Sequence, residues 1–473
     1  MSAPVILTLV LDGKEVNTTW EEVAGWVHQS SPLTSSFSTA WLVVRAIQIF
    51  LVQIGMLLLE IGSISPKNTK AMIIKNIGNS SISAICFYLL GYGFSFGEDG
   101  DDFVGWGGFA TKGDMFANAT KVGDISYNGA TYAHFIYYFC VLNLVPTIVA
   151  GSLSERTHVV AYFVVTFFIS LFVTPVVMHW AWSNKGWASY HSRYLMNTGV
   201  LDFAGSCVVH VSGGIMALVG AYVVGPRKGR FVGERSNVRM PRQNVTYAAL
   251  GAFFMWAGFY ALNMGTIQNF DGDGVNALGK IAINTTICAT TSAIAVTVLT
   301  LYNEKHMEPY SVVNGICTGL AGSSAGCATM TTEGALVTGI LCGAMYFLLS
   351  WMLCSFGIDD VTDVAPIHLG GGMVGIISAA FFTTRPFYKI AVLDSGALTP
   401  CGAFYVCDGL GWRLFVANLL FLLAVAAWSL VAGLALFLPL RIMSLLRVDK
   451  ITEDAGLDFI SGAALAVELK RFN

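Results

Sequence analysis

Two histidines lie inside apolar, glycine-rich stretches in the two halves of the chain. His210 stands within residues 201–214, and His368 stands within residues 359–372. Both stretches are typical of transmembrane helices. A charge at mid-helix costs roughly 2.5–3.5 kcal/mol on insertion scales, so an ionisable side chain in a bilayer usually lines a pathway. We therefore expect a polytopic transporter or channel whose conduction path runs past both imidazoles.

A pair of imidazoles suits a small neutral or protonatable molecule. Each neutral ring donates one hydrogen bond and accepts another. Two rings edge to edge could share a proton and offer hydrogen-bonding groups to a small molecule inside an apolar pore. A bare metal cation is a poorer fit, because it needs several oxygen ligands. A single buried histidine is more often an ordinary core residue. Two histidines that each follow an Asp and precede a glycine pair favour a shared path instead.

Carboxylates stand near both histidines. Asp202 opens the first stretch and Asp363 opens the second, and each is expected to cap its helix by accepting backbone N–H groups. We expect Asp202 also to stabilise a cation that arrives from outside, and Asp363 to have a structural role on the cytoplasmic side. Glu60, near the inner end of the first span, is expected to be structural, either snorkelling or pairing with a lysine such as Lys67.

Three tryptophans, Trp180, Trp182 and Trp187, follow the fourth apolar run. They could form an interfacial belt, which is common at membrane boundaries. An indole face beside an acidic vestibule could instead hold a cation, an interaction worth about 2 kcal/mol when desolvated. Composition alone does not choose between the two.

The composition is that of an integral membrane protein. The 473 residues are 55% hydrophobic and 12% charged, whereas about 25% is charged in an average soluble domain. The net charge of −3 gives no sign of a nucleic-acid partner. Neither an HExxH motif nor a metal-spaced Cys/His cluster occurs, which disfavours a metalloenzyme, and no cofactor is expected. Cys401 and Cys407 share one loop, where a disulfide or two free thiols are both open.

The fold expected is an all-α integral membrane protein with eleven transmembrane helices. Spans one to five and six to ten would be inverted repeats, which place a binding path at their interface, and the eleventh span would stand outside the repeat. The spans are expected near 40–62, 72–96, 131–152, 158–180, 202–224, 246–266, 280–302, 311–330, 334–356, 368–383 and 413–440.

Basic residues indicate the orientation. The loops after spans one and five and the C-terminal tail carry most of them, whereas the loop after span two is acidic. We therefore expect an extracellular segment at 1–37, a membrane domain at 38–440 and a cytoplasmic tail at 441–473. Asn17 and Asn118 begin glycosylation sequons on the expected outer side.

Several motifs in order resemble the ammonium transporters of the Amt/Mep/Rh superfamily, and within it the Amt branch. The similarity covers roughly residues 40–460. Its strongest part is an Asp-Phe-Ala-Gly signature with a histidine eight residues after the Asp. The matching segments are 201–210, 55–68, 151–156, 314–327 and 359–368.

The resemblance implies a plasma-membrane homotrimer with one pore in each subunit, and a role in nitrogen uptake. It implies an outer ammonium site with Trp182 as its aromatic wall, Thr266 in place of the family's serine, and Asp202 as the essential buried carboxylate. His210 and His368 would be the paired pore histidines. It also implies that Glu155, with Arg156, belongs to the cytoplasmic end of span three.

The chain departs from the family pattern at the outer gate. The two stacked phenylalanines of the family fall on Val141 and Leu262 in this sequence. Tyr137, Tyr138, Phe139 or Phe259 could occupy the space. In the tail, Gly456-Leu-Asp458 matches the family's regulatory segment, but the His-Gly that should follow reads Gly462-Ala463, so tail docking on a neighbouring subunit stays open.

The main hypothesis is ammonium transport, with methylammonium as a second substrate. Ammonium would gather at the outer site, lose a proton because desolvation disfavours its charged form, and cross as ammonia along the two histidines. The alternative is an ammonium sensor with little or no flux, motivated by the missing phenylalanine pair. The short tail after Leu440 offers no signalling domain to a sensor.

Overall fold

The computed structural model describes residues 6–11, 14–19 and 32–460, apart from short gaps at 118–119, 123–124, 233–235, 238–239, 268–273 and 393–398. The side chain of Asn17, the second sequon at Asn118 and the Gly462-Ala463 pair lie outside this part.

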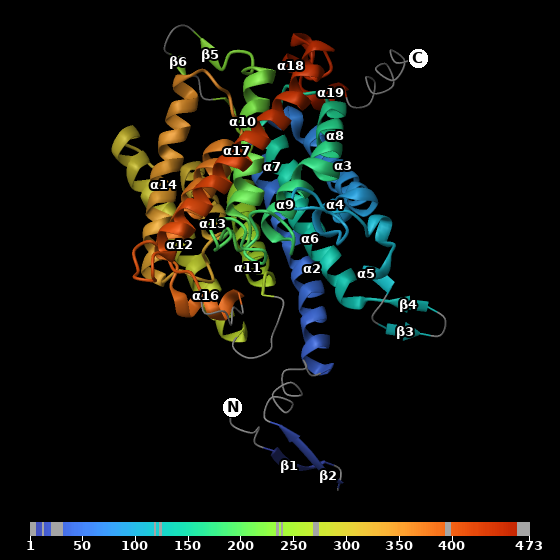
Figure 1. Ribbon diagram of the computed structural model, residues 1–473. Helices are drawn as coiled ribbons and strands as arrows, with labels where there is room; N and C mark the ends of the chain where they lie inside the picture. Colours follow the sequence, from blue (N-terminus) through green and yellow to red (C-terminus); the bar gives the residue numbers. More distant parts are fainter. Residues whose placement is uncertain are drawn as a thin grey trace.

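Long apolar helices make up almost all of the described chain (Figure 1). Ten helical segments are long and apolar enough to cross a membrane, so the expected α-helical membrane fold is confirmed. Their elements are α2 (Pro32–Ser63), α3 (Thr69–Cys86), η2 (Phe87–Gly91), α4 (Tyr92–Phe96), α6 (Gly129–Leu142), α7 (Leu144–Ser152), α8 (Val159–Phe168), η4 (Ile169–Val173), α9 (Thr174–Trp182), η5 (Ser206–Val211), α10 (Ser212–Val224), α11 (Val245–Gly265), α12 (Gly274–Glu304), α14 (Thr332–Ser355), η6 (Ala365–Gly370), α15 (Gly371–Phe382) and α17 (Leu410–Ile442).

The remaining expected span, 311–330, corresponds to α13 (Pro309–Ser323). This helix has 15 residues, fewer than the roughly 20 that a bilayer crossing needs, so the count of eleven stays a prediction. Short elements complete the fold: η1 (Pro66–Asn68), η3 (Phe109–Thr111), α5 (Asp114–Ala117), α16 (Arg385–Val392), α18 (Lys450–Ala455) and α19 (Leu457–Ile460).

Three antiparallel hairpins, which the all-helical expectation did not include, lie between or before the helices. They are β1 (Ile6–Leu11) with β2 (Lys14–Thr19), β3 (Thr120–Val122) with β4 (Ile125–Tyr127), and β5 (Phe231–Val232) with β6 (Ser236–Asn237). Cys401 and Cys407, in the loop before α17, form a disulfide.

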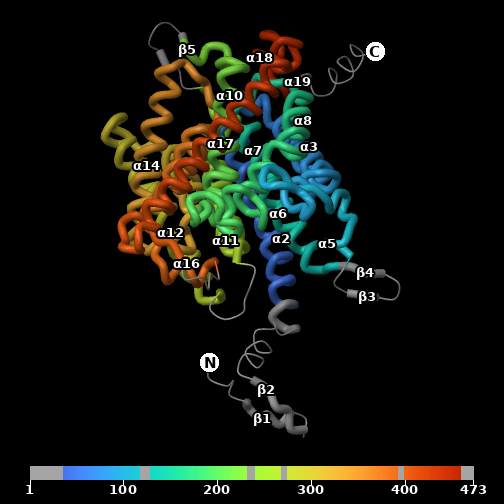
Figure 2. The backbone as a smooth tube through the Cα atoms, viewed as in Figure 1, coloured from blue at the N-terminus to red at the C-terminus, as the bar shows by residue number. Residues whose placement is uncertain are grey.

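The two halves of the chain form the two sides of the bundle (Figure 2). Helices α2, α3, α6 and α8 lie on one side, and α12 and α14 lie on the other. The halves join where α2 packs along α11 and where α10 packs against η6. The long last helix, α17, packs against α10 and α15, across both halves.

Both histidine stretches begin with a π-helical turn, η5 in the first half and η6 in the second. Such turns are rare and occur frequently at functional sites. The glycine pairs that follow the histidines have a packing reason. A Cβ atom on Gly214 would collide with Leu369, and one on Gly372 would collide with the backbone of Ser206. The glycines therefore let the two half-helices approach until their backbones touch.

Candidate functional site

His210 and His368 come together at the centre of the bundle. Their Nδ1 atoms are 3.1 Å apart, and their rings are nearly parallel, with centroids 5.1 Å apart and an interplanar angle of 12°. Both rings are buried, with 1% and 5% of the residue surface exposed. One Nδ1 must donate while the other accepts, so a neutral pair holds a single proton between these two atoms. The rings therefore adopt opposite tautomers.

The two rings differ in their other neighbours. His210 stacks on Phe259 at 5.5 Å, and within the described residues its Nε2 has no hydrogen-bond partner. His368 instead borders a small cavity on the far side of the pair. A buried, unpartnered ring nitrogen can accept or donate a bond to a small passing molecule.

Asp202 caps η5, as expected. Its Oδ2 accepts the backbone N–H groups of Cys207 and Val208 at 2.9 and 2.8 Å. Its Oδ1 is buried and finds no partner among the described residues. Asp202 contributes to the outer site through its backbone, because its carbonyl oxygen accepts the Trp182 indole N–H at 2.9 Å.

The prediction that Asp363 caps the second histidine stretch is wrong. The cap is Asp360, whose Oδ2 accepts the N–H of Ala365 at 2.7 Å and whose Oδ1 is buried without a partner in the part of the chain described. Asp363 has a left-handed backbone, φ 55°, and its carboxylate accepts bonds from Asn314 and Tyr346. Spacing was the missed signal, because Asp360 precedes His368 by eight residues, as Asp202 precedes His210.

A large outer cavity of about 920 Å³ is bordered by Trp182 and Thr266. The Tyr138 ring also borders it, with its centroid 5.6 Å from the Trp182 ring. Tyr137 fixes the Thr266 region, since its hydroxyl donates to the Leu262 carbonyl at 2.8 Å and lies 3.2 Å from the Thr266 hydroxyl. We call this cavity the outer vestibule.

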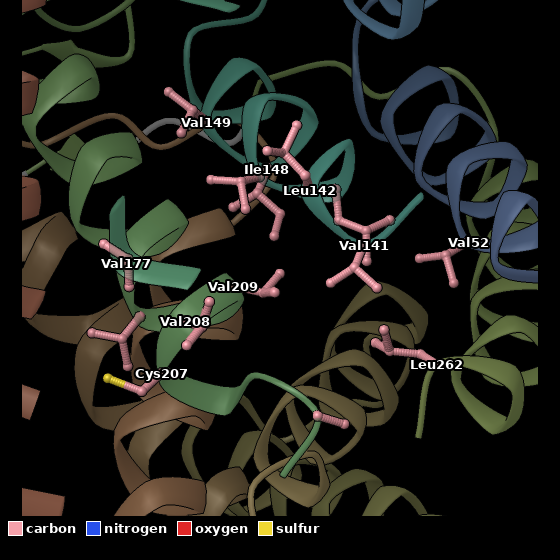
Figure 3. Packing of buried hydrophobic residues seen from close by; sticks show 14 of the residues in the cluster. Val52, Val141, Leu142, Ile148, Val149, Val177, Cys207, Val208, Val209 and Leu262 are labelled. Atoms are coloured by element: carbon pink, nitrogen blue, oxygen red, sulfur yellow. The ribbon is translucent and has the colours of Figure 1, made fainter. Parts of the chain in front are cut away.

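Val141 on α6 and Leu262 on α11 meet at the inner end of this region (Figure 3). They border a void of only about 10 Å³ that shares Tyr138, Trp182 and Phe203 with the vestibule. A cavity needs about 10–15 Å³ to hold one water molecule. The aliphatic pair therefore borders a narrow constriction with room for about one water molecule at most.

The aromatic rings proposed as substitutes for the missing phenylalanines divide into three groups. Tyr137 and Tyr138 border the constriction. Phe259 stacks on His210 instead. Phe139 points elsewhere, toward Phe50 and Phe87. The constriction thus has tyrosine rings beside an aliphatic pair, in place of two stacked phenyl rings.

The chain matches the Ammonium Transporter Family over residues 40–465. It is 32% identical to ammonium transporter 1 member 3 of Solanum lycopersicum over 453 residues, which cover 92% of this chain and 94% of the relative. It is 30% identical to ammonium transporter 3 of Dictyostelium discoideum over 439 residues, 91% of this chain and 95% of the relative.

This chain belongs to the ammonium transporter family. Solved structures agree: a protein described as Sensor Amt Protein superposes with a TM-score of 0.79 at 25% identity, over 90% of this chain and 98% of its own. Mep2 of Saccharomyces cerevisiae superposes with a TM-score of 0.72 at 20% identity, over 90% of this chain and 89% of its own, which shows the shared fold. The function class is therefore ammonium transport across a membrane and not enzymatic catalysis.

Glu155 ties together loops of this transporter at one end of the bundle. It lies three residues after the end of α7, and its Oε1 accepts the Ser65 backbone N–H at 2.7 Å and a side-chain amide N–H of Asn68 at 2.8 Å. Its Oε2 pairs with Arg227, which also contacts Asp359 at 2.7 and 2.9 Å. The contacts of Glu155 thus join three loops, and Glu155 is not among the residues that border the vestibule.

The Arg227–Asp359 pair stays charged although it is buried. Burial alone would raise the pKa of Asp359, but hydrogen bonds from Arg227 and the charges of Arg227 and Arg156 outweigh burial and lower it. Burial would likewise lower the pKa of Arg227, and the hydrogen bonds and charge of Asp359, followed by Glu155, raise it instead. The opposite shifts of the two pKa values have one cause, the direct contact between the two groups.

Proposed function

We propose that the chain takes up ammonium by recruiting NH₄⁺ in the outer vestibule, removing one proton and passing ammonia along His210 and His368. The observation that carries this proposal is the 3.1 Å contact between the two Nδ1 atoms in a buried, otherwise apolar position. An ionisable pair at such depth is costly unless it serves a pathway.

Recruitment rests on Trp182 and Thr266, which border the vestibule together. The indole face attracts a cation through its quadrupole, and the threonine hydroxyl accepts one ammonium N–H. Asp202 supports recruitment in two ways. Its backbone carbonyl orients the Trp182 ring, and its buried carboxylate adds a negative potential that attracts the cation.

Deprotonation follows from desolvation at the constriction. Leaving water lowers the pKa of ammonium, so ammonium gives one proton to a water molecule of the vestibule, which becomes hydronium, and neutral ammonia moves on. The void at Val141 and Leu262 has room for about one molecule of water size at most, so ammonium must leave most of its water shell before it enters. Potassium ions have no proton to lose and meet few oxygen ligands here, so they are excluded.

Replacing each histidine tests this proposal. In oocytes or proteoliposomes, His210→Ala and His368→Ala should each lower ammonium transport at least tenfold. The matched control is His306→Ala, because His306 is exposed beyond α12 and should leave transport unchanged. Normal transport by both pore variants at equal surface expression would refute the proposal.

A second candidate function is ammonium sensing with little flux. Two observations favour it: the narrow aliphatic constriction and the similarity to the structure described as Sensor Amt Protein. Uptake of radiolabelled methylammonium in a transport-deficient yeast separates the two functions. Uptake well above that of the His210→Ala variant supports transport, and uptake equal to it supports sensing.

We further propose a plasma-membrane homotrimer with residues 1–37 outside, a membrane domain at 38–440 and a cytoplasmic tail at 441–473. Contacts support one common side for the basic loops and the tail. Lys67, after α2, donates to the Glu453 carbonyl at 2.9 Å, and the backbone of Lys228, after α10, donates to the Glu453 carboxylate at 2.7 Å. Protease accessibility of the tail in sealed vesicles would test the orientation. Measuring the mass of the protein in nanodiscs would test the trimer.

A further inference from the structure

His134 is a further histidine on the wall of the outer vestibule. It lies on α6, is half-buried, and borders the cavity together with Tyr92, Phe96 and Tyr138. Its Nδ1 lies 3.0 Å from the Tyr92 hydroxyl. Its Nε2 has no hydrogen-bond partner in the described part of the chain and is not a buried atom. The vestibule therefore has an imidazole nitrogen that a small molecule in the cavity can reach.

His179, which borders the same cavity, shows a structural arrangement by contrast. Its exposed fraction is 0%, and its two ring nitrogens lie 2.9 Å from the backbone carbonyl oxygens of Ser95 and Asp101. Both polar atoms of that ring are therefore used inside the protein. His134 differs, because it bonds through one nitrogen and leaves the other to the vestibule.

Aromatic rings hold the His134 ring in place. Its centroid is 4.6 Å from that of Phe96, in an edge-to-face arrangement, and 4.4 Å from that of Tyr138. Phe96 and Tyr138 also contact each other, with centroids 4.5 Å apart. A phenyl ring in place of the imidazole would make the same packing contacts. Packing alone therefore does not account for a histidine here, whereas the bond to Tyr92 fixes the rotation of its ring.

His134 stands on the way from the vestibule to the constriction. Residues 134, 138 and 141 recur at the spacing of one helix face. At about 1.5 Å per residue, His134 lies about 10 Å along the helix from Val141. Tyr138 lies between them, and its ring centroid is 5.6 Å from that of Trp182. A cation that enters the vestibule can therefore meet His134 before it reaches Trp182.

A neutral imidazole nitrogen suits ammonium better than potassium. With the ring proton on Nδ1, Nε2 presents a lone pair that can accept an ammonium N–H. The Tyr92 hydroxyl can accept as well as donate, so its bond to His134 is kept in this tautomer. Potassium has no N–H to donate, and proteins bind it through oxygen atoms. Imidazole nitrogen is instead a typical ligand of transition metals.

The charged groups around the vestibule do not oppose this role. Among the described residues that border it, they are Glu98 and Lys185. The Lys185 Nζ is held by the backbone carbonyl oxygens of Glu98 and Gly100, the latter at 3.3 Å. One negative and one positive charge offset each other, so a neutral acceptor such as His134 meets no excess of positive charge.

We propose that His134 is an ammonium-binding residue of the vestibule, and that its Nε2 lone pair favours ammonium over potassium before the cation reaches Trp182. Tyr92 is a positioning residue, since it holds the ring proton on Nδ1. The place of His134 in transport rests on the proposed function, but binding at His134 does not.

Two amide variants of different reach test the proposal. The Asn amide in His134→Asn reaches only the place of Nδ1, whereas the Gln amide in His134→Gln reaches the place of Nε2. His134→Asn should raise the half-saturating ammonium concentration about tenfold, the effect of one hydrogen bond to a cation, with little change in the maximal rate. His134→Gln should restore the half-saturating concentration of the parent.

Potassium gives a second measurement, which a purely structural role would not change. Uptake into proteoliposomes is measured in potassium chloride against N-methylglucamine chloride, with equal concentrations on both sides of the membrane. The Gln amide offers an oxygen atom, so potassium should compete in His134→Gln and raise its half-saturating ammonium concentration at least about twofold. The parent and the exposed control His306→Gln should be insensitive to potassium.

Binding is also measured without flux, through the ammonium-dependent rise in the melting temperature of the purified protein. His134→Asn should need about tenfold more ammonium for half of this rise. The proposal is overturned if His134→Asn keeps the half-saturating concentrations of the parent, or if potassium leaves His134→Gln unaffected. The potassium measurement decides alone if His134→Asn does not fold. A parent protein that binds ammonium without transporting it would refute the proposed function alone.

Discussion

The indole N–H of Trp182 donates a hydrogen bond to the backbone carbonyl of Asp202 at 2.9 Å. This bond joins the aromatic wall of the outer vestibule to the residue that caps the first histidine helix. The carboxylate of Asp202 faces the other way, toward the N–H groups of η5. One residue thus orients a wall of the vestibule with its backbone and caps the first histidine helix with its side chain.

The first prediction separates these two roles of Asp202. Asp202→Asn keeps an oxygen for the cap and loses the charge, so it should fold normally and raise the half-saturating ammonium concentration at least tenfold. Asp202→Ala also loses the cap, which is worth about 1 kcal/mol of folding free energy. Uptake kinetics and thermal unfolding measure both effects. Equal half-saturation in Asp202→Asn and the parent would show that the charge is not used.

The second prediction concerns the constriction. Leu262→Ala should increase the ratio of methylammonium to ammonium uptake, because it widens a void of about 10 Å³. Since Leu262 is fully buried, the same change should cost about 2–5 kcal/mol of stability. Leu414→Ala, another fully buried leucine outside the constriction, is the control. It should lose similar stability without a change in the uptake ratio.

The third prediction concerns the buried Arg227–Asp359 pair. Asp359→Asn removes one of the two carboxylates that pair with the buried Arg227 and leaves only Glu155, so it should cost up to about 3–5 kcal/mol. The folded state lowers the pKa of Asp359 below its unfolded value of about 3.9. Its contribution is therefore fully present above about pH 4 and is lost as the pH falls further. Unfolding of parent and variant from pH 3 to pH 8 checks this, and a constant difference would contradict it.

The fourth prediction concerns Asp360, the cap of the second histidine helix. Burial, and then the charge of Asp363, raises the pKa of Asp360 to about 7, while Arg156 acts in the opposite direction. From about pH 4 to pH 7 the unfolded chain has released a proton that the folded chain keeps, so stability falls across this window. Asp360→Asn should remove this part of the pH dependence. The exposed Asp408→Asn should leave the slope intact.

Local patterns in the sequence were sufficient for the helical membrane fold and for the histidine pair. Apolar runs of about 20 residues have few other stable arrangements, and the bounds of most helices agree with the expected spans within a few residues. The two histidine stretches share residue types and spacing, and repetition of this kind is readable in one dimension. The repeated stretches predicted that the two histidines meet, and their Nδ1 atoms are 3.1 Å apart in the structure.

The hydrogen-bond and ion-pair partners of individual side chains could not be predicted from the sequence in the same way. Asp363 was chosen as the cap because it stands next to the helix, but the backbone turn at Asp363 directs its carboxylate to Asn314 and Tyr346, and Asp360 takes the cap. Glu60 was expected to snorkel or to pair with a lysine such as Lys67, and the structure pairs it with Lys75 from α3, whereas Lys67 contacts the tail. Several partners are equally close along the chain, and only the direction of each side chain decides among them.

The sequence by itself therefore determined that this protein is a helical membrane transporter of the ammonium family with two histidines in matching halves, because hydrophobic runs and repeated motifs are local properties. Only the tertiary structure decided that Val141 and Leu262 border a narrow void below the vestibule, and that Glu60 and His368 line one small cavity. Cavities and constrictions are spaces between helices far apart in sequence, so they exist only once those helices have packed.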